Sequence, residues 1–171
     1  MIDGAELRIL DTHRDERGSF TEIFYSSWGL CIDPVQWSVV SSKKGTLRGM
    51  HLHKRHDEYI SVLSGRAFVG LVDLRPGSPT EDQSLLVEMV GKEMACLSFP
   101  RGVVHGWYFP EETIHIQSVS EDFANYGHDD NAGCHWNDPE LGIHWPGTPE
   151  LVAPRAAGFG SLSELKEAMR R

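Results

Sequence analysis

The sequence of 171 residues is poor in three features that would assign a protein to a class directly. It has three cysteines, Cys31, Cys96 and Cys134, an odd number without a CxxC spacing, so it supports neither a disulfide framework nor a thiolate zinc site. It has no apolar run near the roughly 20 residues that cross a bilayer. Basic residues number 16 against 25 acidic ones, for a net charge of −9. This balance argues against nucleic-acid or anionic-membrane partners, which need a basic face.

The remaining composition describes an ordinary globular domain. The first residues, Met1–Gly4, lack the basic and apolar regions of a secretory signal, so we expect a soluble, cytoplasmic protein. No linker, repeat or low-complexity segment divides the chain, which predicts a single domain over residues 1–171. Apolar residues make up 40% of the chain, enough to fill a core, and 17 glycines indicate many turns. Nine histidines are the unusual component.

Short runs rich in Val, Ile, Phe, Tyr and Trp alternate with Gly, Pro, Ser and Asp, a pattern typical of a β-sandwich or β-barrel. The expected strands are Ser19–Tyr25, Val35–Ser41, Thr46–Leu52, Tyr59–Leu63, Arg66–Leu74, Ser84–Val90, Met94–Phe99, Val103–Phe109 and Ile114–Val119. Residues 121–160 lose this periodicity and are expected to form a loop around the barrel, in which His128–Asp130 is interpreted as a solvated turn. A short C-terminal helix is predicted over Ser161–Arg171, where Ser161 and Glu164 can form a capping box.

The densest chemical signal lies in Gly45–Gly65, with the spacing GxxxxxHxHxxxxExxxxxxG. His51 and His53 are two residues apart on a predicted strand, so their side chains leave the same face. Glu58 follows a short polar turn and returns beside them if the next strand pairs antiparallel. Downstream, Pro100–His105 has the spacing PxGxxH and adds a fourth side chain of the metal-ligand type.

These two runs resemble the two signature motifs of the cupin superfamily, small β-barrels in which three histidines and one glutamate bind a metal. The resemblance implies an all-β fold, a cupin or jelly-roll β-barrel. It also implies, as one interpretation, a divalent metal site. Its ligands would be His51, His53, Glu58 and His105. The alternative for the HxH pair alone is two half-exposed strand histidines without a ligand.

A narrower resemblance, to dTDP-4-dehydrorhamnose 3,5-epimerases, covers almost the whole chain. The matching blocks occur in the family's order at residues 15–22, Gln36 with the Ser-rich turn after it, and residues 47–51, 72–80, 99–106, 136–139 and 142–146. Those enzymes are cupin barrels that form homodimers and bind no metal. They invert carbons 3 and 5 of a dTDP-linked 4-keto-6-deoxy sugar in dTDP-rhamnose biosynthesis. The resemblance therefore implies an isomerase that acts on a nucleotide sugar without a cofactor.

The resemblance also assigns roles to residues. It makes His51 the base that removes a proton beside the ketone, with Asp138 as its hydrogen-bond partner. Arg17 and Arg48 would bind the diphosphate, because a planar guanidinium matches phosphate oxygens. The family's N-terminal strand completes the partner's pocket, so Arg17 would act in trans. The sugar and nucleotide pocket would also include Glu22, Gln36, His105 and Gln117. Taken singly, Arg17 could be a surface ion pair and Asp138 a turn cap.

Two positions depart from the family pattern. The lysine that stabilises the developing enolate in the family is Glu58 here, and a carboxylate would repel that charge. The tyrosine that reprotonates the sugar from the opposite face aligns with Gln117, whose amide has no useful proton near neutral pH. The asparagine of a Gln-x-Asn segment is Ser38 here.

These departures leave three interpretations open. If His51 is the base, the enzyme inverts one carbon rather than two, or exchanges the proton more slowly. If a divalent metal replaces the lysine as a Lewis acid, His51 cannot give one lone pair to both metal and proton, and another base such as His115 is required. In the third interpretation, the protein binds a sugar nucleotide without turning it over.

Overall fold

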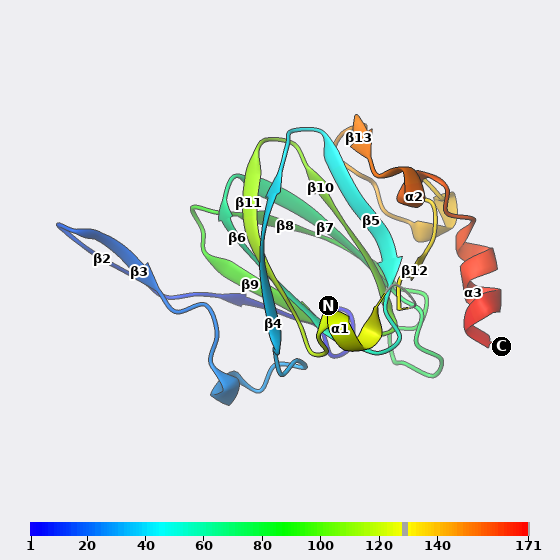
Figure 1. The fold of residues 1–171 in the computed structure, drawn as a ribbon, viewed down its shortest axis with the longest axis horizontal. Coiled ribbons are helices and arrows are strands. Elements are labelled where there is room, and N and C mark those ends of the chain that lie inside the picture. The colour runs from blue at the N-terminus through cyan, green and yellow to red at the C-terminus, as the bar shows by residue number, and fades with distance from the viewer. Residues whose placement is uncertain (128–129, 171) are drawn as a thin grey trace.

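Two sheets face each other and form the barrel seen in Figure 1. The structure is a computed structural model and describes residues 1–127 and 130–170. The first sheet has the strand order β1-β9-β6-β11-β4, and the second has the order β12-β5-β10-β7-β8, with β13 beside β5. The strands are β1 Glu6–Ile9, β2 Thr12–Asp15, β3 Gly18–Thr21, β4 Gln36–Ser42, β5 Thr46–Leu52, β6 Glu58–Ser64, β7 Arg66–Asp73, β8 Ser84–Val90, β9 Ala95–Phe99, β10 Val103–Phe109, β11 Thr113–Val119, β12 Ala132–Gly133 and β13 Leu151–Val152. The predicted all-β jelly-roll class is confirmed.

The alternating pattern located the barrel strands well. Strands β5, β8 and β10 have the predicted bounds. The other barrel strands expected between residues 35 and 119 differ by one residue, at both ends in β4 and β6 and at one end in β7, β9 and β11. The predicted strand Ser19–Tyr25 is wrong in its second half. Strand β3 stops at Thr21 because its partner β2 begins opposite it, at Thr12, and the chain then continues into the 3-10 turn η1, Ser26–Trp28.

Alternate side chains of both sheets fill the space between them. The apolar core includes Ile60, Val62, Val69, Leu71, Phe99, Trp107 and Phe109. Toward one end of the barrel, inward-facing positions of the same strands carry polar instead of apolar side chains. Strand β6 places Glu58 two residues before Ile60, and β10 places His105 two residues before Trp107. The fold therefore directs polar side chains into a largely apolar interior.

The C-terminal segment covers the outer face of the second sheet. Residues expected to be a loop contain the short elements α1 Phe123–Tyr126, η2 Pro139–Leu141 and α2 Pro154–Ala157, and the two-residue strands β12 and β13 extend the sheet beside β5. Helix α3, Leu162–Arg170, follows the predicted capping box, in which the backbone N–H of Glu164 donates to Ser161 Oγ at 3.2 Å. Leu162 and Leu165 pack in one apolar cluster with Val104 of β10. Among the described residues, no helix is long and apolar enough to cross a membrane.

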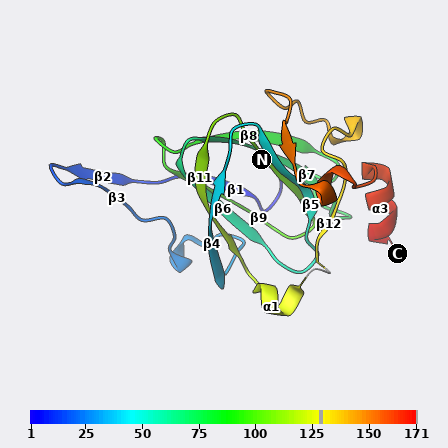
Figure 2. The same cartoon turned by 45° about the horizontal axis from the view of Figure 1, so that its top comes forward.

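The hairpin of β2 and β3 extends away from the barrel, on the side opposite α3 (Figures 1 and 2). It forms a two-stranded sheet of its own. Phe20 on this hairpin is 62% exposed, and Ile9 just before it is 74% exposed. The apolar side chains of this arm therefore lack a covering layer within the described part of the chain.

A buried carboxylate fixes the turn after β7. Asp73 has no solvent exposure and accepts hydrogen bonds from Arg75 Nη2 at 2.7 Å, Ser78 Oγ at 2.6 Å and Thr80 Oγ1 at 2.7 Å. Burial alone would raise the pKa of Asp73, but these donors outweigh burial and lower the pKa below its ordinary value. The charged form of Asp73 therefore stabilises the folded state.

We predict that Asp73→Ala lowers the free energy of unfolding at pH 7 by about 2–3 kcal/mol, because buried donors lose their acceptor. Since the pKa of Asp73 is lowered by folding, its contribution is complete above the unfolded pKa and declines as the pH falls below about 4. Urea unfolding at pH 7 and at about pH 3 measures both effects, with the exposed Glu93→Ala as control. Equal stabilities of the two variants at pH 7 would contradict the assignment.

Candidate functional site

Three histidines and one glutamate meet inside the barrel. His51 lies on β5, His53 directly after the end of β5, His105 on β10 and Glu58 on β6. Ring nitrogens of the three histidines lie within 4.8 Å of one another. Glu58 Oε1 lies 3.0 Å from His53 Nε2 and 3.5 Å from His105 Nε2. The structure thus brings together the four side chains that the two motifs predicted as a group.

The route by which Glu58 reaches the histidines differs from the prediction. Strand β6 does not pair with β5; it pairs with β9 and β11 in the opposite sheet. Glu58 therefore meets His53 across the barrel interior, where inward side chains of the two sheets face each other. The site is held by both sheets rather than by one hairpin.

Sequence reasoning missed two residues of this cluster. His56 Nε2 lies 3.7 Å from Glu58 Oε1, and the His56 ring stacks on that of His53 with centroids 4.0 Å apart. Asp130, interpreted above as part of a solvated turn, is only 5% exposed, while residues 128 and 129 lie outside the described part. The extended spacing HxHxxH was the signal that could have identified His56.

Asp130 organises the loop between β5 and β6. Its carboxylate accepts hydrogen bonds from the backbone N–H groups of Lys54 at 2.6 Å and Arg55 at 3.0 Å, and its Oδ2 lies 2.9 Å from His56 Nδ1. Its backbone carbonyl accepts a hydrogen bond from His53 Nδ1. Asp130 therefore holds the His53 ring by a hydrogen bond and lies close to the His56 ring.

Burial sets the charges of the site. Burial and neighbouring histidines lower the pKa of His51 to about 3, and burial lowers the pKa of His105 to about 4, so both rings are neutral at pH 7. Burial also lowers the pKa of His53, but Glu58 outweighs this effect and the pKa lies above its ordinary value. Burial raises the pKa of Glu58, yet the nearby histidines hold it well below its ordinary value. The lowered pKa favours the ionised form of Glu58.

Asp138 is not the hydrogen-bond partner of His51 in this structure. Its Oδ1 accepts from the N–H of Glu140 at 2.8 Å, and its Oδ2 accepts from the N–H of Leu162 at 2.8 Å. Both oxygens therefore cap helical turns, the alternative role considered from the sequence. Among the described residues, no carboxylate forms a hydrogen bond with His51.

His51 instead borders a small cavity. The cavity has a volume of about 300 Å³ and is lined on one side by β5, including Arg48, and on the other by residues 151–153 and Ala156. The His51 ring contacts Phe159 edge-on, with centroids 6.1 Å apart. A neutral imidazole beside a cavity can accept a proton from a bound ligand.

The two positions that depart from the family pattern are neighbours in space. Gln117 Nε2 donates a hydrogen bond to Glu58 Oε2 at 3.0 Å. Ser38, the third departure, lies opposite Gln117 in the register of β4 and β11. The substituted residues therefore form one coherent polar group, in which Glu58 Oε2 faces the amide and Oε1 faces the histidines.

Three further residues named in the sequence analysis form hydrogen bonds or ring contacts with other parts of the barrel. Arg48 Nε donates to Ser42 Oγ at 3.0 Å and so links β5 to β4, which are joined by a turn but are not paired. Gln36 Oε1 accepts from the N–H of Phe123 at 2.9 Å and fixes the start of α1. His115 is fully buried, and its ring stacks on Phe109 at an interplanar angle of 11°.

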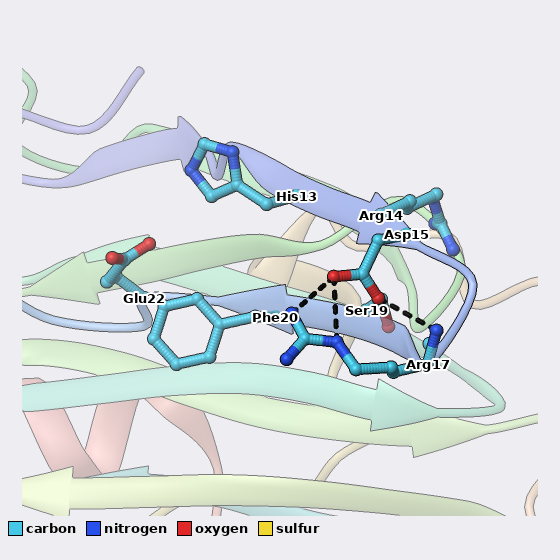
Figure 3. A pocket seen from close by; sticks show the side chains of 8 residues that line it. His13, Arg14, Asp15, Arg17, Ser19, Phe20 and Glu22 are labelled. Carbon is cyan, nitrogen blue, oxygen red and sulfur yellow. Dashed lines mark hydrogen bonds and ion pairs between the residues drawn. The ribbon is translucent and has the colours of Figure 1, made fainter.

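Arg17 and Glu22 lie on and just after the projecting hairpin rather than in the barrel. Arg17 pairs with Asp15 at 2.5 Å, and its side chain is 85% exposed. Figure 3 shows Arg17 and Asp15 at the tip of the hairpin, and Glu22 near Phe20 and His13 at the other end of a groove of about 530 Å³. Within one protomer, these residues do not join the histidine cluster.

Comparisons with known proteins agree on one family. Residues 1–164 match the family model described as dTDP-4-dehydrorhamnose 3,5-epimerase. The spore coat polysaccharide biosynthesis protein SpsL of Bacillus subtilis (strain 168) is 30% identical over 149 residues, 85% of this chain and 97% of SpsL. The dTDP-4-dehydrorhamnose 3,5-epimerase of Escherichia coli (strain K12) is 29% identical over 161 residues, 88% of this chain and 85% of that protein.

A solved structure shows the same likeness. It is dTDP-6-deoxy-D-glucose-3,5-epimerase from Legionella pneumophila Philadelphia 1 in complex with dTDP-4-keto-L-rhamnose. The match has a TM-score of 0.87 and 30% sequence identity, and it covers 95% of this chain and 90% of that chain. The fold and the order of the elements are thus shared.

Proposed function

We propose that this chain, which belongs to the dTDP-4-dehydrorhamnose 3,5-epimerase family, is an isomerase of a nucleotide-linked 4-keto-6-deoxy sugar. The observation that supports it is the neutral His51 beside a cavity on β5. His51 removes a proton from the carbon next to the ketone. Because Gln117 has no proton to give, a solvent water molecule protonates the opposite face of the enolate and inverts the carbon, and the hydroxide that remains takes the proton from His51. The relative from L. pneumophila, solved with a dTDP-sugar, supports the substrate class.

The proposed reaction inverts one carbon rather than two. The acid that would protonate the opposite face is replaced by Gln117, whose amide is held by Glu58 at 3.0 Å. One acid–base group typically contributes about 10²–10⁴-fold to a rate. Its loss slows the second inversion and leaves proton exchange at the carbon that His51 reaches.

We propose that the functional unit is a homodimer. The projecting hairpin leaves Phe20 exposed, and the outer faces of the paired strands β4 and β11 expose Val39 by 73% and Ile114 by 42%. A second copy would cover these apolar side chains. It would also bring Arg17 of one protomer toward Arg48 of its partner, to bind the diphosphate. The three unpaired cysteines are compatible with the proposed cytoplasmic location.

A metal-dependent cupin enzyme is the second candidate. Its ligands would be the predicted set of His51, His53, Glu58 and His105, and the approach of the three histidines within 4.8 Å favours it. The donor set suits a divalent ion, which would supply Lewis-acid polarisation of a ketone. This candidate needs His115 as base, but His115 is fully buried against Phe109. Dialysis against a chelator abolishes activity in this candidate alone.

The base is tested by deuterium exchange. With dTDP-4-keto-6-deoxyglucose in D₂O, NMR should show deuterium entering carbon 3 or carbon 5 with the wild-type protein. His51→Asn should lower the exchange rate by about 10²–10⁴-fold, because the proton acceptor is lost. Asp138→Asn should exchange at nearly the wild-type rate, since its carboxylate only caps helical turns.

Nearly wild-type exchange by His51→Asn together with slow exchange by Asp138→Asn would contradict this assignment of the base. Wild-type protein without exchange at either carbon excludes this substrate and mechanism. If the nucleotide sugar then still raises the melting temperature, the protein is a sugar-nucleotide binder, the third interpretation of the sequence.

The role of Arg17 across a dimer is tested by mixing inactive variants. Arg17→Ala and His51→Asn should each be impaired alone. When they are refolded together, half of the dimers are mixed, and each mixed dimer contains one intact site, so about a quarter of the wild-type activity should return. If Arg17 acts within its own subunit, the mixture shows only the mean activity of the two variants.

A further inference from the structure

Aromatic rings, rather than hydrogen bonds, surround the proposed base. Among residues 1–127 and 130–170, no group forms a hydrogen bond with the His51 ring. Its ring centroid lies 6.2 Å from that of His53, 6.1 Å from that of His105 and 6.1 Å from that of Phe159. Of these three rings, Phe159 alone comes from the C-terminal segment. The orientation of an imidazole without a hydrogen-bond partner depends on how its neighbours pack against it.

A glycine opposite His51 leaves the space that the Phe159 ring occupies. Strand β12 pairs with β5, and Gly133 lies opposite His51 in their register. A Cβ atom on Gly133 would overlap with the Phe159 ring and with the Met50 carbonyl oxygen. Because this position has no side chain, Phe159 can approach the base, and its ring stands at 89° to the imidazole.

Arg155 and a backbone hydrogen bond hold Phe159 in this place. Arg155 lies on α2, and its Cζ is 5.7 Å from the centroid of the Phe159 ring, within the range of a cation–π contact. Its Nη2 donates a hydrogen bond to the carbonyl of Asn131, the residue before β12. The next residue along the chain, Gly160, accepts a hydrogen bond from the N–H of His135 at 2.7 Å. Arg155 therefore joins α2, the segment before β12 and the ring beside the base.

We infer that Phe159, held by Arg155, is the positioning residue of His51. The family resemblance gives this role to a carboxylate, but both oxygens of Asp138 cap helical turns. An aromatic ring perpendicular to the imidazole restricts its rotation by packing. It neither accepts a hydrogen bond from the imidazole in the manner of a carboxylate nor carries a charge. Phe159 therefore contributes the geometry of the base and leaves its charge to other groups.

The position of Phe159 predicts which kinetic constant it affects. The cavity beside His51 is lined by β5, residues 151–153 and Ala156, and Phe159 is not one of its lining residues. Loss of the ring should therefore leave substrate binding unchanged. It should lower the fraction of time for which the base is in the reacting position, and with it kcat. Only this effect on the reaction rests on the proposed function, because the packing of the two rings can be measured without a substrate.

The kinetic experiment measures deuterium exchange into dTDP-4-keto-6-deoxyglucose over a range of substrate concentrations. Phe159→Leu should lower kcat at least about 10-fold with KM within about twofold of the wild type. Phe159→Tyr keeps the ring and should restore most of kcat. Arg155→Ala should lower kcat about threefold, the size of an exposed cation–π contact. Arg66→Ala is the matched control, because Arg66 pairs with Glu88 on the adjacent strand and should exchange at the wild-type rate.

A double variant tests whether Arg155 acts through the ring. Arg155→Ala should have no further effect in the Phe159→Leu protein, because the contact that it removes is already lost. Effects that multiply would show that Arg155 acts on the reaction independently of Phe159, and would overturn its assignment as the residue that holds the ring.

An NMR measurement without substrate separates this inference from the proposed function. The ring protons of His51, assigned by their absence in His51→Asn, should shift in Phe159→Leu, because the ring current of Phe159 is lost. Unchanged His51 signals, or a raised KM with unchanged kcat, would overturn the positioning role. If Phe159→Leu does not fold, Arg155→Ala replaces it, since its side chain is exposed, and must shift the same signals. Wild-type protein without exchange would contradict the proposed function, and the His51 signals would still decide the role of Phe159.

Discussion

The charge on Glu58 is the constraint on which the interior of this barrel depends. An ionised carboxylate that is 2% exposed is unstable in an apolar core unless donors or cations compensate it. Gln117 supplies a hydrogen bond at 3.0 Å to one oxygen. The histidines gather at the other oxygen, with His53 at 3.0 Å. Side chains from both sheets are thus tied to one charge, which couples the arrangement of the site to the packing of the barrel.

The same constraint explains why the departures from the family pattern occur together. A carboxylate at position 58 needs a donor on the adjacent strand, and Gln117 is that donor, where a tyrosine is expected from the family resemblance. The histidines at positions 53 and 56 then need their own orienting groups. Asp130 accepts a hydrogen bond from His53 through its carbonyl, and its carboxylate lies 2.9 Å from His56 Nδ1. These residues act as a set, so a change in one without the others would leave a buried polar atom without a partner.

The sequence predicted local features well and long-range ones poorly. Period-two alternation located the barrel strands, and the HxH spacing identified two histidines of the site. The spacing did not show that Glu58 lies on the opposite sheet, because local spacing does not determine which strands pair. Asp130 meets His53 across 77 residues, a separation that no local pattern reveals. Asp138 caps helical turns in this structure, and the sequence could not separate this role from that of a partner of His51, because a capping aspartate and an orienting aspartate have the same sequence environment.

The charge of Glu58 also has two opposed effects on the proposed chemistry. It repels an enolate that forms nearby, yet it favours the protonated form of His51, whose pKa it raises against the lowering by burial. A carboxylate alone would therefore assist the removal of the proton and oppose the charge that results. A cation between Glu58 and the histidines would neutralise the carboxylate and supply the positive field that the enolate requires. The carboxylate at position 58 thus favours the removal of the proton and opposes the enolate, and this conflict is what any function of the barrel has to resolve.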